Sequence, residues 1–316
     1  MDAHRLGHRS RVAQRVEAFY PQLLLSKEKQ SARSSAPPAL RVRGLGFCYP
    51  RWPRRRKEDF ALQDLSFEVP QGLSLGLLGA NGSGKSTLLA CLGGALIPTG
   101  GEIEWLGKKT LSLELQQEIG LLPEAELPFP WMSASSFLNM TARVIGIPKN
   151  EGKARTRALL QEFGLENAGR KPHGKLSKGM RRRLGLAVAL LQEPSILLLD
   201  EPLSGMDPVG VEAVRGTLER HRKKGGTAVV STHQLEELED LFDRILVLDQ
   251  GRIVGFGSIE EVLGREGAWT FELEGTEGDR VLPLLQPLLN EGVRLKSFGP
   301  SRQALGRFLL NLRKGR

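Results

Sequence analysis

The sequence contains few cysteines, few aromatic residues and no long apolar run. The two cysteines, Cys48 and Cys91, have no metal-ligand spacing, and a reducing compartment keeps both as thiols, so we interpret them as packing residues. Aromatic residues make up only 6% of the chain, which disfavours an aromatic-rich β-sandwich. No stretch approaches the roughly 18 apolar residues of a membrane span, and the N-terminus lacks the apolar core of a secretory signal. We therefore expect a cytoplasmic protein.

The net charge of +9 is concentrated at one end of the chain. Residues 1–57 contain 14 Lys and Arg against three acidic residues, and the remainder of the 316 residues sums to −2. A basic arm of this kind can bind RNA or anionic lipid headgroups, but it is also typical of a solvated tail. Both readings stay open at this point.

Composition divides the chain into three parts. Residues 1–38 are rich in Ser, Gln and Arg and end in two prolines, which predicts a flexible basic tail; a short amphipathic helix over Val12–Leu25 stays open, although Pro21 interrupts it. Residues 39–264 form the predicted main domain. After Gly264 a new strand-helix-strand-helix rhythm predicts a small C-terminal α+β lobe over residues 265–316.

The main domain alternates between short apolar runs and helical patterns. The runs, which predict buried strands, cover residues 73–78, 196–199, 227–230 and 245–248. Helical patterns cover residues 85–92, 184–191 and 209–222. This alternation predicts an α/β fold with βαβ units and a mainly parallel sheet, whose ligands bind at the carboxyl ends of the strands.

A glycine-rich loop follows the first of these runs and precedes a helical pattern. Its glycines let backbone N–H groups surround a phosphate at a helix N-terminus, where the helix dipole already favours an anion. The lysine adds a positive charge, the serine after it can bind Mg²⁺, and the threonine can reach the α-phosphate. The strand-loop-helix setting therefore predicts an ATP-binding loop made of Gly79, Ala80, Asn81, Gly82, Ser83, Gly84, Lys85, Ser86 and Thr87.

A second apolar run ends in two carboxylates, Asp200 and Glu201. Burying such a pair is costly unless a cation or a substrate uses it. An apolar run before Asp-Glu also occurs by chance, but beside a phosphate loop it predicts a Walker B motif. Because consecutive strand residues point to opposite faces, we expect Asp200 to hold Mg²⁺ through water and Glu201 to orient the attacking water.

The segment Leu176–Arg181, Leu-Ser-Lys-Gly-Met-Arg, decides between the families that share these two motifs. It resembles the Leu-Ser-Gly-Gly-Gln signature of ABC-type ATPases and lies about 20 residues before the Walker B carboxylates, although Ser177 would also serve as an ordinary helix cap. The resemblance implies that residues of this segment contact the γ-phosphate of ATP bound to a second subunit: Ser177, Lys178, Gly179 and Met180.

Four further positions match the family in its order. Tyr49 lies where an aromatic ring stacks on adenine, and Glu124 lies at the Q-loop glutamine, which touches Mg²⁺ and responds to the membrane subunit. Asp207 resembles the D-loop residue at the dimer interface, and His233 resembles the switch histidine that contacts the γ-phosphate. The structural alternatives are core packing for Tyr49, a surface turn for Glu124, a helix start for Asp207 and a structural role for His233.

The sequence departs from the family pattern at three positions. Glu124 replaces Gln, Lys178 replaces the first signature Gly, and Met180 replaces the signature Gln. None removes a group that hydrolysis requires. Leu-Pro-Glu and Leu-Ser-Lys-Gly-Met, together with the C-terminal lobe, resemble one subgroup of ABC exporters.

The resemblance implies a P-loop NTPase of ABC type with a mainly parallel core sheet, an antiparallel β subdomain and a helical subdomain near residues 125–175. It implies an ATPase with ATP and Mg²⁺ as cofactors that pairs with an identical or related ATPase subunit. This pair would bind a separate membrane permease at the cytoplasmic face of the membrane, and Phe129–Met132 is the candidate contact, with core packing as its alternative. No specific nucleic acid is expected. The alternative function is a cytosolic ABC ATPase that acts on ribosomes or nucleic acid, which the basic arm alone supports.

Overall fold

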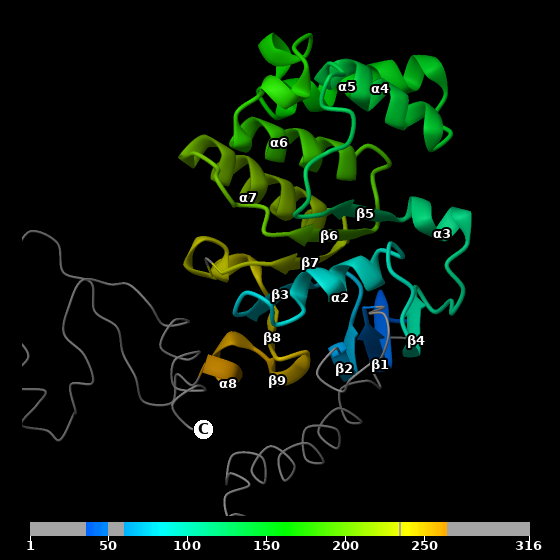
Figure 1. The fold of residues 1–316 in the computed structure, drawn as a ribbon, viewed down its shortest axis with the longest axis vertical. Helices are drawn as coiled ribbons and strands as arrows, with labels where there is room; N and C mark the ends of the chain where they lie inside the picture. The colour runs from blue at the N-terminus through cyan, green and yellow to red at the C-terminus, as the bar shows by residue number, and fades with distance from the viewer. Residues whose placement is uncertain (1–35, 50–59, 234, 264–316) are drawn as a thin grey trace, which may run out of the picture. The chain divides into compact units, whose positions relative to one another are not determined.

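The structure is a computed structural model that describes residues 36–49, 60–233 and 235–263 (Figure 1). These residues, apart from Leu263, belong to one compact unit that ends at Val262. The predicted helix over residues 12–25, nearly all of the predicted tail and the predicted lobe over residues 265–316 lie outside the described residues. In the described part of the chain, no helix has the length and apolar character needed to cross a bilayer.

A six-stranded sheet forms the centre of the molecule. Its first five strands run parallel and the last is antiparallel, which confirms the predicted mainly parallel sheet. Each predicted run overlaps one strand, and the bounds of the run and the strand differ by at most one residue at either end. The order across the sheet is β5 (Ile119–Leu122), β6 (Ile196–Asp200), β7 (Thr227–Ser231), β3 (Ser74–Gly79), β8 (Arg244–Asp249) and β9 (Arg252–Gly257).

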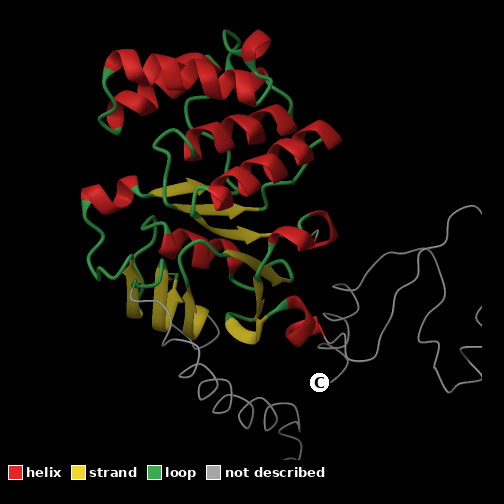
Figure 2. Cartoon of the chain, turned by 180° about the vertical axis from the view of Figure 1, so that it is seen from behind, coloured by secondary structure: helices red, strands yellow, loops and turns green. Residues whose placement is uncertain are grey.

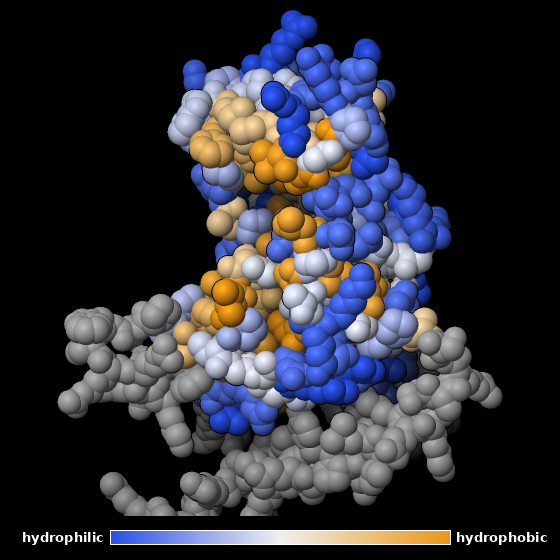
Figure 3. All heavy atoms as spheres, turned by 90° about the vertical axis from the view of Figure 1, so that its right-hand side faces the viewer, coloured by the Kyte–Doolittle hydropathy of each residue, from blue (hydrophilic) through white to orange (hydrophobic). Residues whose placement is uncertain are grey.

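Helices cover one face of this sheet and continue into a helical layer beyond it (Figures 1 and 2). The covering helices are α6 (Lys178–Ala189) and α7 (Pro208–Lys223), and the layer beyond contains α4 (Ala134–Val144) and α5 (Lys149–Glu162). In Figure 3 the outermost part of the molecule on this face is hydrophilic, and hydrophobic residues gather in one band below it and in a second band further down. The short helices are α3 (Leu113–Gln117), α8 (Ile259–Leu263), η3 (Glu166–Ala168), η4 (His173–Lys175), η5 (Leu235–Glu237) and η6 (Glu239–Leu241).

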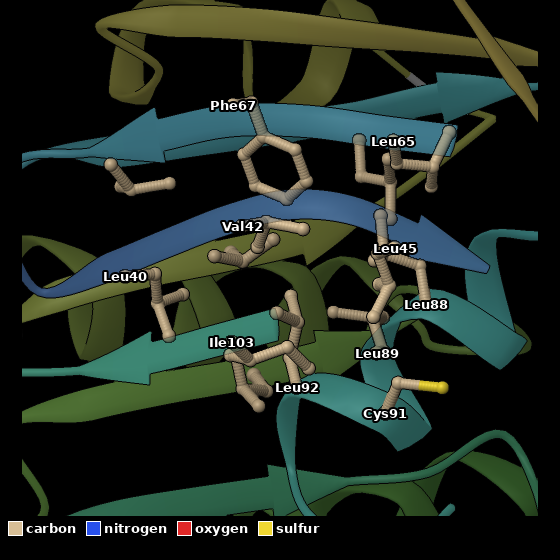
Figure 4. Packing of buried hydrophobic residues seen from close by; sticks show 14 of the residues in the cluster. Leu40, Val42, Leu45, Leu65, Phe67, Leu88, Leu89, Cys91, Leu92 and Ile103 are labelled. Atoms are coloured by element: carbon tan, nitrogen blue, oxygen red, sulfur yellow. The ribbon is translucent and has the colours of Figure 1, made fainter. Parts of the chain in front are cut away.

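The helix after the glycine-rich loop, α2 (Lys85–Leu92), packs between two sheets. On one side lies an antiparallel sheet in the order β2 (Phe60–Val69), β1 (Leu40–Cys48) and β4 (Gly100–Trp105). Figure 4 shows leucines of α2 among the aliphatic side chains of these strands, and the same core continues onto one face of the six-stranded sheet. Burial on both sides fixes the loop that precedes α2. Cys91 lies in this core, and burial raises the pKa of its thiol to about 11.

Helix α6 lies unusually close to β5 because both carry glycine where they meet. A Cβ atom on Gly120 would overlap the backbone carbonyl of Ala189, and one on Gly185 would lie 2.6 Å from a methyl group of Leu122. The apolar pattern covers this helix only from residue 184, because its first turn is polar. The helix begins at Lys178 with Ser177 as its cap, which is the helix start considered for this residue from the sequence.

The last turn of helix α7 contains a buried histidine, His221, which packs against the start of β7. Its Nε2 lies 3.1 Å from the carbonyl oxygen of Thr227, and its ring covers Gly226. Burial lowers the pKa of His221 below its ordinary value of 6.5, and the carbonyl of Thr227 partly opposes this effect.

We predict that His221 makes the fold sensitive to mild acid. Below pH 6.5 the unfolded chain protonates this residue before the folded protein does, so the unfolding free energy falls as the pH falls. The His221→Gln variant keeps an N–H for Thr227 but does not titrate. Urea unfolding near pH 7.5 and pH 5.5 should show a smaller loss of stability in the variant, and equal losses in the two proteins would contradict the prediction.

Candidate nucleotide site

Parallel pairing brings the ends of four strands to one edge of the sheet. Leu77 of β3 and Asp200 of β6 both pair with Ser231 of β7, and Leu122 of β5 pairs with Leu199. The segments that follow these strands contain most of the predicted site residues. This edge, at the carboxyl ends of the strands, is where α/β sheets bind their ligands.

The glycine-rich loop between β3 and α2 is built around Lys85. This lysine is buried, and its Nζ donates to the carbonyl oxygens of Gly79 at 2.9 Å and Ala80 at 3.3 Å. Helix α2 begins without a side-chain cap, and the buried Oγ of Ser83 has no hydrogen-bond partner within the part of the chain that the structure describes. An anion at this helix N-terminus would supply the missing acceptors.

Glycine is required in this loop for a steric reason. Gly84 has a φ angle of +108°, and a Cβ atom there would lie 2.7 Å from the carbonyl oxygen of Ala61. Gly82 also has a positive φ of +79°, but the space around it is open. The chain therefore turns tightly at residue 84 and leaves room outside residue 82 for a ligand to approach the backbone.

The carboxylates of Asp200 and Glu201 have different hydrogen-bond partners, although the predicted alternation along the strand is not the reason. Strand β6 ends at Asp200, so alternation along a strand does not separate the two carboxylates. Instead, Glu201 has a φ angle of +48°, which turns the chain out of the sheet. Asp200 stays buried and its Oδ1 accepts a hydrogen bond from the Oγ of Ser231 at 2.6 Å.

The carboxylate of Glu201 lies between residues of two other segments. Its Oε2 is 2.6 Å from the Nδ1 of His233, and its Oε1 is 4.0 Å from the Nζ of Lys85. The imidazole is half-exposed, whereas the glutamate side chain is only 12% exposed. The structure thus brings together a base, a cation and a histidine that are far apart in the sequence.

The signature segment lies on other elements. The Oγ of Ser177 accepts from the backbone N–H of Met180 at 3.2 Å, and the Nζ of Lys178 donates to the Oγ of Ser204 at 3.1 Å. Nearby, Asp207 accepts from the N–H of Gly210 and caps α7. Within the described residues, no hydrogen bond or ion pair joins residues 177–180 to the loop at 79–87.

Two further predicted residues lie at the surface, and one of them contacts the loop. Tyr49 is 47% exposed, its hydroxyl is 3.1 Å from the Oγ1 of Thr87, and the edge of its ring meets Phe47. Core packing therefore does not explain Tyr49. Glu124 is exposed directly after β5 and Pro123.

The predicted magnesium ligands do not form a metal site by themselves. No group of three His, Cys, Asp or Glu residues able to hold a metal occurs among the described residues. Ser86 offers an exposed hydroxyl and Asp200 a buried carboxylate, and this sparse set fits Mg²⁺, which keeps waters and takes phosphate oxygens in nucleotide sites.

Sequence reasoning missed two residues of this edge, Ser231 and Arg182. Ser231 ends β7 and bonds both the carboxylate of Asp200 and the N–H of Glu201. The position of Ser231 at the end of an apolar run offered a signal. Arg182 belongs to a run of three arginines, and the sequence contains nothing that distinguishes it from its neighbours.

Comparison with known proteins gives the family of this chain. The family model described as ABC transporter matches residues 62–204. An uncharacterized ABC transporter ATP-binding protein of Nostoc sp. is 37% identical over 221 residues, which cover 69% of this chain and 65% of the relative. The Nod factor export ATP-binding protein I of Ralstonia nicotianae is 33% identical over 254 residues, which cover 79% of this chain and 77% of the relative.

A solved structure shares the fold. It is described as the ATP binding subunit of an ABC transporter, is 27% identical, and matches with a TM-score of 0.63 over 78% of this chain and 99% of that one. The predicted fold class and the resemblance to ABC-type ATPases are confirmed. The chain belongs to the ABC transporter ATP-binding proteins, the ATP-hydrolysing subunits of these transporters.

Proposed function

We propose that Glu201 orients the attacking water in ATP hydrolysis, with Lys85 and His233 at the γ-phosphate. The observation that carries this proposal is the convergence of the three side chains at the carboxyl edge of the sheet. Phosphoryl transfer depends mainly on positioning and charge stabilisation, which a cation, a histidine and an oriented carboxylate provide. The glycine-rich loop would hold the phosphates, and Tyr49 would stack on the adenine.

The sparse carboxylate set supports a magnesium site completed by the nucleotide. Mg²⁺ would supply charge neutralisation between the phosphates. Ser86 would hold it through its hydroxyl, and Asp200 would hold it through water. Ser231 fixes the carboxylate of Asp200 for this role, and Glu124 adds a further carboxylate at the same edge.

We predict that Glu201→Gln abolishes turnover and retains ATP binding. The amide keeps the shape of the side chain but cannot accept a proton, so kcat should fall about 100-fold or more. ATP should still bind, because the glycine-rich loop is unchanged. The matched control is Glu193→Gln, an exposed glutamate just before the same strand, which should keep its ATPase activity. Normal hydrolysis by Glu201→Gln would remove the proposed role.

The site would be completed by a second ATPase subunit. Ser177 and Lys178 are exposed at the start of α6 and do not bond to the glycine-rich loop of their own chain. A helix N-terminus facing solvent suits the phosphate of a nucleotide held by another copy. Lys178 adds a positive charge, and Gly179, Met180 and Asp207 would lie at the same interface.

We predict that two inactive variants restore activity when they are mixed. In Lys85→Ala every site lacks its lysine, and in Ser177→Ala every site lacks its signature serine. A mixed dimer contains one complete composite site, so an equal mixture that exchanges subunits should reach about a quarter of wild-type ATPase activity. No recovery, with exchange verified, would contradict a shared site. Thermal unfolding controls for the helix cap that Ser177→Ala also removes.

The contact with the permease is proposed at two exposed aromatic residues. Trp131 is 71% exposed and Phe129 43% exposed, so core packing does not explain them. Their rings meet edge to face at 5.6 Å, and Phe129 has a positive φ angle. Exposed aromatic residues of this kind are typical of interface hot spots.

The loop that carries the aromatic pair is tied to the segment before the signature. The N–H of His173 donates to the carbonyl of Met132, and the N–H of Gly174 donates to that of Pro130. The Nε2 of His173 is also 3.0 Å from the carbonyl oxygen of Pro128. A permease that moved this loop would therefore displace the residues directly before Ser177.

We predict that Trp131→Ala separates membrane association from hydrolysis. Purification of the tagged chain from detergent-solubilised membranes should recover a multi-span permease, and Trp131→Ala should lower its yield about 10-fold or more. The ATPase activity of the isolated subunit should not change. Ile97→Ala, another exposed apolar residue, is the control. Equal recovery with both variants would exclude the proposed contact.

The proposed direction of transport is export. Two features support it: the exporter-like Leu-Pro-Glu and Leu-Ser-Lys-Gly-Met segments, and the similarity to a protein named for Nod factor export. A role on ribosomes or nucleic acid has only the basic arm in its favour. The same purification tests it, because ribosomes or nucleic acid in place of a permease would support that role.

A further inference from the structure

Arg182 joins the signature helix to two strand ends at the nucleotide site. It is 8% exposed and lies in the second turn of α6. Its Nη1 donates to the carbonyl oxygen of Pro123 at 2.5 Å. Its Nε and Nη2 both donate to the carbonyl oxygen of Glu201, at 3.3 Å and 3.1 Å. One guanidinium therefore holds the chain just before Glu124 and the chain at Glu201.

The peptide groups on both sides of Glu201 are held. Its N–H donates to the Oγ of Ser231 at 2.8 Å, and its carbonyl oxygen accepts the two bonds from Arg182. Glu201 has a φ angle of +48°, which residues other than glycine rarely adopt unless the surrounding structure supports it. The side chain therefore starts from a fixed backbone position, and its carboxylate lies toward Lys85 and His233.

The neighbouring arginines do not share this arrangement. Arg181 donates to the carbonyl of Leu176 and pairs with Glu126. Arg183 donates to the carbonyl of Phe163 in the helical layer. Among the described residues, Arg182 is the one arginine that donates hydrogen bonds to Glu201, and it directly follows the signature segment Leu176–Arg181.

The charge of Arg182 fits its surroundings. Burial lowers the pKa of its guanidinium, and the nearby carboxylates of Asp200, Glu124 and Glu201 oppose that effect. A buried cation is stable only where hydrogen bonds and opposite charges compensate for the lost water. The planar fork of arginine places separate nitrogens against the carbonyls of Pro123 and Glu201, whereas a lysine would have to serve both from one nitrogen.

We infer that Arg182 is a positioning residue for hydrolysis, which fixes the backbone of Glu201 to the signature helix and to the segment that carries Glu124. The inference rests on the proposed role of Glu201. Since the same helix begins with the signature, any displacement of α6 relative to the sheet moves the carbonyl of Glu201 and turns its carboxylate. The arrangement of α6 thereby controls whether the attacking water is oriented.

The test compares Arg182→Met and Arg182→Lys with Arg183→Met in the full-length chain. Arg182→Met should lower kcat about 10-fold or more, because small misplacements of a catalytic group reduce rates strongly. The Kd for a fluorescent ATP analogue should stay within about 2-fold of the wild-type value, because the glycine-rich loop is untouched. Arg182→Lys should recover part of kcat, and Arg183→Met should match the wild type. Circular dichroism verifies folding, and Arg182→Lys carries the test if Arg182→Met does not fold.

A double variant distinguishes positioning of Glu201 from general support of the fold. If Arg182 acts through Glu201, adding Arg182→Met to Glu201→Gln causes no further loss in single-turnover hydrolysis. Losses that multiply would overturn the inference, as would an unchanged kcat in Arg182→Met. Normal turnover in Glu201→Gln alone would instead overturn the proposed function, so the two failures are distinguishable.

Discussion

The parallel pairing of β6 with β7 is the constraint on which the nucleotide site depends. It places Asp200 opposite Ser231, whose hydroxyl donates to the Asp200 carboxylate and accepts from the N–H of Glu201. A slip of one residue would move every side chain of β6 to the other face. Because β6 is apolar and buried on both faces, a slip would still bury its leucines, but it would take the carboxylate of Asp200 away from its hydrogen bond with Ser231.

The packing around α2 fixes the phosphate loop relative to that pair. Its leucines lie between two sheets, so the helix cannot shift without opening the core that Figure 4 shows. Lys85 at the first position of this helix is consequently held 4.0 Å from the carboxylate of Glu201. Lys85 and Glu201, which are far apart in the sequence, thus meet at a fixed distance because α2 and β6 are each held in place by their own buried contacts.

The sequence predicted the parts of this site that depend on local chemistry. The glycine-rich loop, the apolar strands and the carboxylates at a strand end all have local patterns, and the structure places them at one edge of the sheet. The left-handed turn at Glu201 and the clamp at Arg182 could not be predicted. They depend on how α6 packs against the strand ends, and Arg181, Arg182 and Arg183 are the same residue type in a row. The exposure of Trp131 was likewise undecidable, since an apolar segment suits a core or an interface equally.

Hydrogen bonds connect the start of α6 and the segment before it with the aromatic loop on one side and with the nucleotide site on the other. The backbone of the aromatic loop is bonded to His173 and Gly174, and the helix begins a few residues later. From the same helix, Lys178 reaches Ser204 in the turn before α7, and Arg182 reaches the carbonyl of Glu201. The close contacts at the glycines of α6 and β5 hold α6 tightly against the sheet. Because this packing leaves no free space, a displacement of the aromatic loop would shift α6 as a rigid unit. A permease bound at Trp131 would then influence hydrolysis through the backbone of Glu201, without any contact with the nucleotide.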